Sequence, residues 1–147
     1  MLTASVATAA RPAATPSTTA DVAAHVGTWA CTGTFDATFT SPQGLKPIHG
    51  SGPLTAVVID NGDGTVTNTV TDSDGACAWK ENIAGMTATV PVGQSCHRKN
   101  ATITMTSLSI TVNGTTATGR SVATVTANTD SGPQVSQWVD DVTCTKR

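Results

Sequence analysis

Four cysteines constrain the fold of this chain more than any other feature. They are spread along most of its length, at Cys31, Cys77, Cys96 and Cys144. Their spacing has none of the close pairs that zinc ligands favour, so we expect two disulfides, with a zinc site or free thiols as the alternative. Disulfides persist in oxidising compartments, and the cysteines therefore indicate a secreted or periplasmic protein.

The residues around the first and last cysteines alternate as in half-buried β-strands. From 25 to 40, Trp29, Cys31, Phe35, Ala37 and Phe39 share one face, and the opposite face is mostly threonine. Residues 134–147 repeat the pattern, because side chains of equal parity lie on the same face of a strand. Turn motifs divide the chain between these two segments, at Asn61-Gly62-Asp63-Gly64, Ser73-Asp74-Gly75, Ala84-Gly85, Asn113-Gly114 and Asp130-Ser131-Gly132-Pro133.

Short strands separated by regular turns predict a sandwich or a barrel. We expect an all-β fold, a single up-and-down antiparallel β-barrel of about eight strands that disulfides staple. In a closed barrel the first and last strands are neighbours, so Cys31 faces Cys144, while Cys77 and Cys96 flank the hairpin at Ala84-Gly85. A change of parity between Met105 and Leu108 also predicts a β-bulge near Thr106-Ser107.

Composition narrows the possible partners. Charged residues make up 12% of the chain, the net charge is -2 and no basic stripe is present, so we expect no nucleic-acid partner. No apolar run approaches the ~20 residues of a membrane-spanning helix, and we expect no membrane span. About one residue in five is threonine. Strands with so little charge are weakly protected against edge pairing, so self-association is possible and a structural or surface-assembly protein is one alternative function.

The first 24 residues differ from the rest of the chain. They are rich in alanine, threonine and proline and have no periodicity, which predicts a disordered tail or linker over 1–24 and a barrel domain over 25–147. Ala7-Thr8-Ala9 is similar to the end of a signal peptide, but the stretch before it is short and opens without a positive charge. We therefore expect the signal sequence to be absent or incomplete.

The motif Gly27-Thr28-Trp29 at the start of the first predicted strand resembles that of the lipocalin and avidin group of calycins. The resemblance implies a lipocalin-like barrel that binds a small hydrophobic molecule in its interior. It also implies that Trp29 closes the barrel floor, with Arg147 or Lys146 packed over it. The chain departs from the second lipocalin motif, Thr-Asp-Tyr, because Thr129-Asp130 is followed by Ser131.

The interior of such a barrel holds side chains or one small ligand. The predicted inward positions are mostly aliphatic, so both a cavity and a barrel filled by its own side chains remain open. These inward positions are Val66, Val70, Ile83, Met86, Ala88, Val90, Val92, Ile103, Met105, Leu108, Ile110 and Val112. The candidate ligand-binding residues are Trp29, Phe35, Phe39, Trp79, Glu81, Met105 and Trp138.

Two carboxylates have the parity of inward side chains. Glu81 shares parity with Trp79, and Asp140 with Trp138, so each could orient the polar end of a ligand or act as general acid or base in a cyclase or isomerase. A shift of register would instead place Glu81 at a strand edge. We expect no cofactor and no metal site, since the three histidines have no ligand-like spacing.

Overall fold

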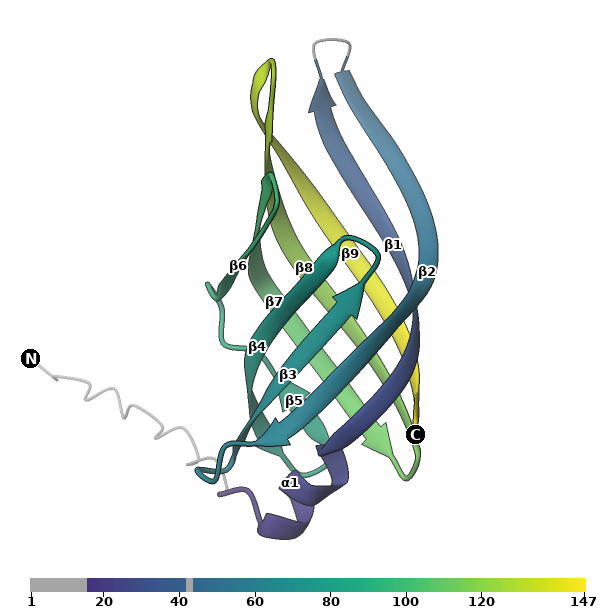
Figure 1. Cartoon of the computed structure of the whole chain (residues 1–147), viewed down its shortest axis with the longest axis vertical. Helices are drawn as coiled ribbons and strands as arrows, with labels where there is room; N and C mark the ends of the chain where they lie inside the picture. Colours follow the sequence, from purple (N-terminus) through teal and green to yellow (C-terminus); the bar gives the residue numbers. More distant parts are fainter. Residues whose placement is uncertain (1–15, 42–43) are drawn as a thin grey trace, which may run out of the picture.

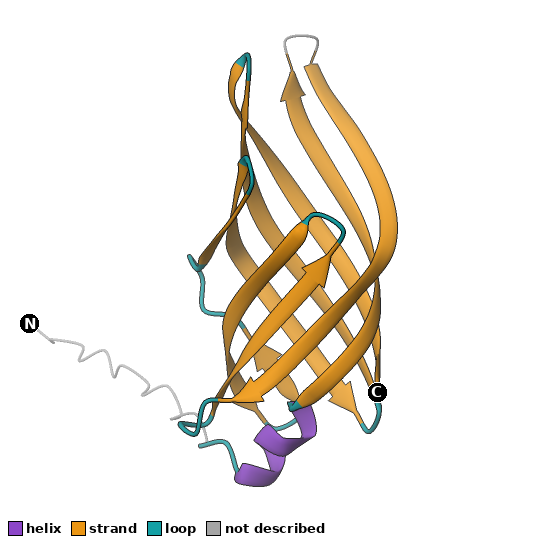
Figure 2. Ribbon diagram, viewed as in Figure 1, coloured by secondary structure: helices purple, strands orange, loops and turns teal. Residues whose placement is uncertain are grey.

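The computed structural model describes residues 16–41 and 44–147. Nearly all of this part of the chain forms antiparallel strands (Figures 1 and 2). The elements are α1 (Thr19–His25), β1 (Gly27–Ser41), β2 (Gly44–Asp60), β3 (Thr65–Asp72), β4 (Gly75–Ala84), β5 (Thr87–Thr89), β6 (Ser95–Arg98), β7 (Ala101–Asn113), β8 (Thr116–Thr129) and β9 (Gly132–Lys146).

Eight of these strands close into a barrel, which confirms the predicted fold. The order around the ring is β5-β4-β3-β2-β1-β9-β8-β7, and β5 closes it by pairing with β7. That closing pair is short, running from Thr87 to Thr89 on β5. A further strand, β6, pairs with β7 beyond the closing pair. β6 was not expected from the sequence, because a four-residue strand has too few positions to show an alternating pattern.

Both predicted disulfides are present. Cys31 lies opposite Cys144 in the β1–β9 ladder and is bonded to it. Cys77 on β4 is bonded to Cys96 on β6. The structure thus contains the disulfide-stapled barrel expected from the order of the strands.

The parity of the strands places the expected side chains inside, with two exceptions. A register shift between Met105 and Ser107 is the predicted bulge, and it keeps both Met105 and Val112 buried. The expectation that Met86 and Val92 point inward is wrong, since they are 42% and 78% exposed. Met86 lies in the β4–β5 turn and Val92 in the β5–β6 connection, where strand parity no longer decides orientation.

Helix α1 lies against one end of the barrel (Figure 1). Thr18 and Asp21 form a capping box that starts the helix, and its Val22 and His25 are buried. For residues 19–24 the expectation of a disordered tail is therefore wrong. Residues 1–15 of that predicted tail lie outside the described residues.

Trp29 is buried beside this helix, at the end of the barrel that α1 covers. Its indole Nε1 donates a hydrogen bond of 2.9 Å to the backbone oxygen of His25. Lys146 Nζ lies 5.2 Å from the centre of the Trp29 ring and donates to the backbone oxygen of Ala24 at 3.2 Å. The lysine thereby occupies the position that the lipocalin resemblance assigns to Arg147 or Lys146, and its contact with the ring is a cation–π interaction.

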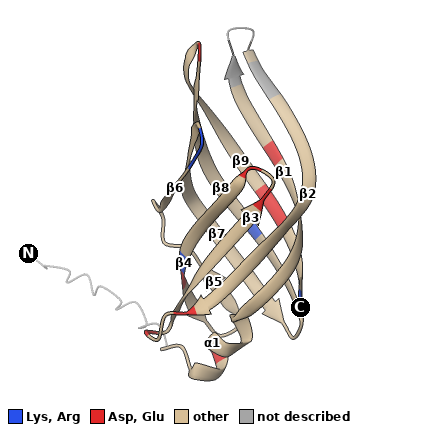
Figure 3. Ribbon diagram, in the orientation of Figure 1, with Lys and Arg blue, Asp and Glu red and all other residues tan. Residues whose placement is uncertain are grey.

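No helix among the described residues covers the opposite end of the barrel, which we call the open end. Strands β1, β2, β8 and β9 extend well past the β3–β4 turn (Figure 1). β2 pairs with β3 only from Thr55 to Asp60, so its first part has a strand partner on one side, β1. Charged residues are scattered over the strands and turns, including those near the open end (Figure 3). One end of the barrel is thus covered by α1, and no described helix covers the other.

Candidate functional site

Two aromatic rings lie together on the inner face near the open end. Phe35 on β1 and Trp138 on β9 stack with their ring centres 4.8 Å apart and their planes 17° from parallel. The Trp138 indole Nε1 donates a hydrogen bond of 2.7 Å to Ser136 Oγ, which holds the ring in one orientation. Both aromatic residues remain partly exposed. We call Phe35 and Trp138 the aromatic pair.

The inner wall beside the aromatic pair is built from glycine. Gly50 lies opposite Phe35 in the β1–β2 ladder, and Gly52 lies opposite Gly33. A Cβ at position 50 would overlap the Phe35 ring, whereas a Cβ at position 52 would meet nothing within 4 Å. Gly50 therefore gives the Phe35 ring its place, and Gly52 borders open space.

Asp140 lies next to the aromatic pair on the same face of β9. It is opposite Phe35 on β1 and opposite Ser121 on β8. The Ser121 hydroxyl donates a hydrogen bond of 3.3 Å to Asp140 Oδ2. Burial raises the pKa of Asp140 above its usual value; the Ser121 hydrogen bond offsets part of this, while the charges of Asp141 and Asp72 add to it.

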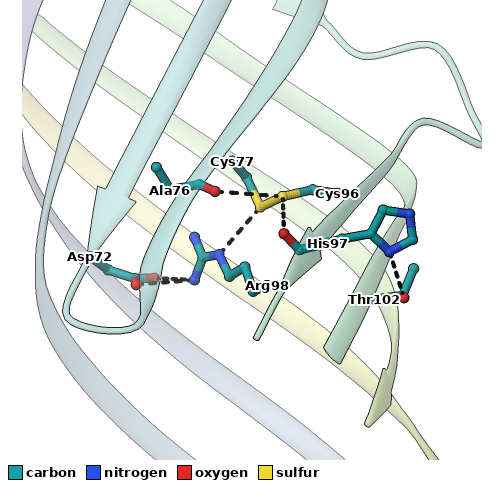
Figure 4. The surroundings of a disulfide bond; sticks show 7 residues. All are labelled: Asp72, Ala76, Cys77, Cys96, His97, Arg98 and Thr102. Atoms are coloured by element: carbon teal, nitrogen blue, oxygen red, sulfur yellow. Dashed lines mark hydrogen bonds and ion pairs between the residues drawn. A yellow bond between two sulfur atoms is a disulfide. The ribbon is translucent and has the colours of Figure 1, made fainter. Parts of the chain in front are cut away.

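Asp72, at the end of β3, belongs to a group of residues that joins β3 and β4 to β6 (Figure 4). Arg98 Nη1 lies 3.0 and 2.8 Å from the two carboxylate oxygens of Asp72, and Arg98 Nε donates to Cys77 Sγ at 3.2 Å. The Cys77–Cys96 disulfide crosses the same gap between the strands. Because Asp72 is paired with Arg98, the negative charge of this carboxylate is largely neutralised.

The side-chain amide of Gln94 also bridges to β4, near the disulfide. Gln94 Oε1 accepts a hydrogen bond of 2.9 Å from the backbone N–H of Lys80, and Gln94 Nε2 donates to the backbone oxygen of Lys80 at 2.7 Å. Gln94 thus pairs with β4 as a strand backbone would. The barrel is therefore joined here by side chains and a disulfide, above the short β5–β7 ladder.

A second polar pair lies inside the barrel, at Glu81 on β4 and Asn68 on β3. They are 2% and 3% exposed, and Asn68 Nδ2 donates a hydrogen bond of 2.8 Å to Glu81 Oε1. Burial raises the pKa of Glu81 to about 7, although the Asn68 hydrogen bond lowers it. Asn68 Oδ1 is buried and accepts no hydrogen bond among the described residues. A protonated Glu81 has the hydroxyl that can donate to such an acceptor.

The candidate ligand-binding residues are divided among several regions. Trp29 packs in the hydrophobic cluster that includes Val22 of α1, while Trp79 and Met105 belong to a second cluster. Phe39 lies opposite Ser136, farther along β1 than the aromatic pair. Of the predicted set, Phe35 and Trp138 are in direct contact, with Asp140 next to them.

The two candidate catalytic carboxylates are separate. Glu81 lies opposite Val66 and Asp140 opposite Phe35. Within residues 16–41 and 44–147 no hydrogen bond or electrostatic interaction joins them. The structure therefore places them in different environments, one deeply buried and one half-exposed.

Sequence reasoning missed Gly33, Gly50, Gly52, Arg98 and Asn68. Each has the parity of an inward residue on its strand, so extending the alternation into these strands would have placed them inside. Glycine and arginine were overlooked because the search for inward positions followed apolar side chains. Pairing with Asp72 is what allows Arg98 to be largely buried.

Two open hollows on the barrel are lined by residues other than the candidate ligand-binding residues. One of about 400 Å³ lies at the bulge, among Val90, Val92, Leu108, Arg120 and Val122. Another of about 320 Å³ lies near the β1–β2 pair and includes Leu54, Asp72 and Arg147. Neither hollow is lined by the aromatic pair or by any other candidate ligand-binding residue.

Two further features of the described residues bear on the site. In the part of the chain that the structure describes, no group of three or more His, Cys, Asp or Glu residues could hold a metal ion. Among the same residues, no helix has both the length and the hydropathy needed to cross a membrane.

Comparison with known proteins assigns no family. No protein-family model matches the chain, and no curated protein matches it. Among solved structures it is similar to a protein of unknown function, from the DUF3598 family, of Nostoc punctiforme PCC 73102. The identity is 12% and the TM-score 0.34, over 86% of this chain. The match spans about half, 49%, of the Nostoc chain.

Proposed function

We propose that this protein is a lipocalin-like barrel that binds a small, mostly hydrophobic molecule at its open end. The apolar part of the molecule lies against Phe35 and Trp138, and its polar end points toward Asp140. The aromatic pair is the observation that carries the proposal, because its stacked rings face inward and remain accessible to solvent. Ligand sites combine such apolar surfaces with a few placed polar groups.

The placement of the aromatic residues supports this function. The chain has three tryptophans and two phenylalanines, so aromatic surface is scarce. Burial of apolar surface stabilises the fold, and burial of these large rings contributes most. Yet three of the five, Phe35, Phe39 and Trp138, are only half-buried, so part of their surface stays in water. A flat apolar ligand would remove that surface from water.

The surrounding wall supports binding in the same place. Gly50 makes room for the Phe35 ring, and the position of Gly52, opposite Gly33, borders open space. The Ser136 hydrogen bond holds the Trp138 ring before any ligand arrives. A preformed surface loses little conformational entropy when a ligand binds.

The unpaired edge of β2 favours ligand binding over surface assembly. It contains Pro47 and Pro53, which lack the backbone N–H that strand pairing uses. Prolines at an exposed edge are a common protection against pairing with another chain. The alternative of a surface-assembly protein would have to use a different part of the barrel.

We also propose that the protein is secreted or periplasmic. The Cys31–Cys144 and Cys77–Cys96 disulfides support this location, because disulfides form and persist mainly in oxidising compartments.

The test is a titration with N-phenyl-1-naphthylamine, a neutral dye whose emission rises in apolar surroundings. We expect saturable binding with one dye per chain, and about tenfold weaker binding by Trp138→Ala, which removes half of the aromatic pair. The control is Val135→Ala, which trims a 52% exposed side chain of β9. Absence of saturable binding, or equal affinity for Trp138→Ala and Val135→Ala, would contradict the proposal.

A further inference from the structure

Asp140 is an inward carboxylate without a cationic partner among the described residues. Its hydrogen bond comes from the neutral Ser121 hydroxyl, and the charged groups that act on its pKa, Asp141 and Asp72, are carboxylates with cationic partners of their own. A partly buried carboxylate is stabilised best by a positive charge. The open end therefore contains an uncompensated negative charge.

Three cations of the barrel are engaged elsewhere. Arg98 is paired with Asp72 at 2.8 Å. Arg120 lies 3.4 Å from Asp141, whose parity directs it to the outer face. Lys146 lies over Trp29 and donates to the backbone oxygen of Ala24 in α1. None of these three compensates the charge of Asp140, and among the described residues no hydrogen bond or ion pair joins a cationic side chain to it. A cationic ligand would supply the missing positive charge.

The aromatic pair lies beside this carboxylate. Phe35 is directly opposite Asp140 in the β1–β9 ladder, and Trp138 is two residues away on the same face of β9. Directly opposed residues in an antiparallel pair have Cβ atoms about 5 Å apart. An ammonium group can thus contact the carboxylate and an aromatic face together, and both attract a cation.

We propose that the ligand of this site is an amine, with a protonated nitrogen paired to Asp140 and an apolar body on the aromatic pair. This inference rests on the proposed function and narrows it to one chemical class. Removal of solvent from the site when the ligand body covers it would strengthen the ion pair, because the pair then lies in a medium of lower dielectric constant. The open space beside Gly52 leaves room for the ligand body.

The experiment compares three probes that differ in one group: 2-phenylethylamine, 2-phenylethanol and phenylacetate. Each is titrated into the ¹⁵N-labelled full-length protein at pH 8, with binding followed by chemical-shift changes. We expect the amine to bind about tenfold more tightly than the alcohol, since one charge-assisted contact is added, and phenylacetate to bind most weakly. The largest changes should map to the backbone around Phe35 and Trp138.

Two matched variants test whether the Asp140 carboxylate is the group that recognises the amine. Asp140→Asn should abolish the preference for the amine while the alcohol binds as before. Asp141→Asn removes the same charge from the outward neighbour and should keep the preference. Equal binding of amine and alcohol, or a preference that survives in Asp140→Asn, would overturn the amine assignment and leave the proposed function intact. Failure of the naphthylamine dye and of all three probes to bind would overturn both.

Discussion

Replacement of Glu81 by glutamine tests the account of the barrel interior most directly. Glu81 is 2% exposed and its hydrogen-bond partner is the equally buried Asn68. Glutamine has the same shape, can accept from Asn68 Nδ2, and carries an N–H group for Asn68 Oδ1, which is otherwise unpaired. It cannot ionise. We therefore expect Glu81→Gln to fold normally and to differ from the wild type in how its stability depends on pH.

The magnitude follows from the pKa of Glu81. Burial raises this pKa from 4.5 to about 7, so between these values the folded protein holds a proton that the unfolded chain has lost. The stabilisation is fully present below pH 4.5 and is lost as the pH rises to about 7. Each pKa unit corresponds to about 1.4 kcal/mol. The free energy of unfolding of the wild type should therefore fall by about 3 kcal/mol relative to Glu81→Gln across this range.

The assay is urea unfolding of both proteins, with disulfides intact, at pH values from 4 to 8 and constant ionic strength. His25 and Asp140 also titrate with shifted pKa values, but they are present in both proteins and cancel in the difference. Asp130→Asn, at an exposed turn, serves as the control and should follow the wild type. A wild-type-minus-variant difference that is flat from pH 4 to 8 would refute the reasoning that Glu81 is a buried, protonated acid.

Two further predictions concern packing and the disulfides. Gly50→Ala should destabilise the fold by about 1 to 3 kcal/mol, because the new methyl overlaps the Phe35 ring, and should change the near-ultraviolet circular dichroism of the stacked pair. Gly52→Ala, with nothing within 4 Å of the new methyl, should change neither; equal effects would contradict the packing argument. By loop-closure entropy, loss of the Cys31–Cys144 bond should cost about 5 kcal/mol and loss of Cys77–Cys96 about 3, since they span 113 and 19 residues. Double-serine variants in urea unfolding test this order.

The strand pattern was readable from the sequence where alternation was regular. On β1 the odd residues from Trp29 to Phe39 are buried or half-buried, as their parity predicts. The bulge near Thr106-Ser107 was also predictable, because a change of parity within one strand requires an extra residue. The two disulfides followed from the order of the strands around a closed ring.

The sequence pattern did not predict α1 and β6, because both elements are stabilised by contacts with the rest of the barrel. Helix α1 lies in a segment rich in alanine and threonine, and burial of Val22 and His25 against the barrel holds it. Short helices and strands are marginal alone and depend on tertiary packing. β6 is likewise joined to β4 by the Cys77–Cys96 disulfide and to the end of β3 by the Arg98–Asp72 ion pair.

The sequence by itself predicted the fold class and the pairing of the cysteines, because period-two alternation is a local property of the chain. It left open whether Glu81 and Asp140 point inward, since a shift of register would change that direction. The tertiary structure alone decided which inward residues meet. It brought Phe35 of β1 onto Trp138 of β9 and placed Gly50 of β2 under the Phe35 ring. It also gave Asp72 a cation and left Asp140 without one. Those relations depend on register between strands distant in sequence, which no local pattern encodes.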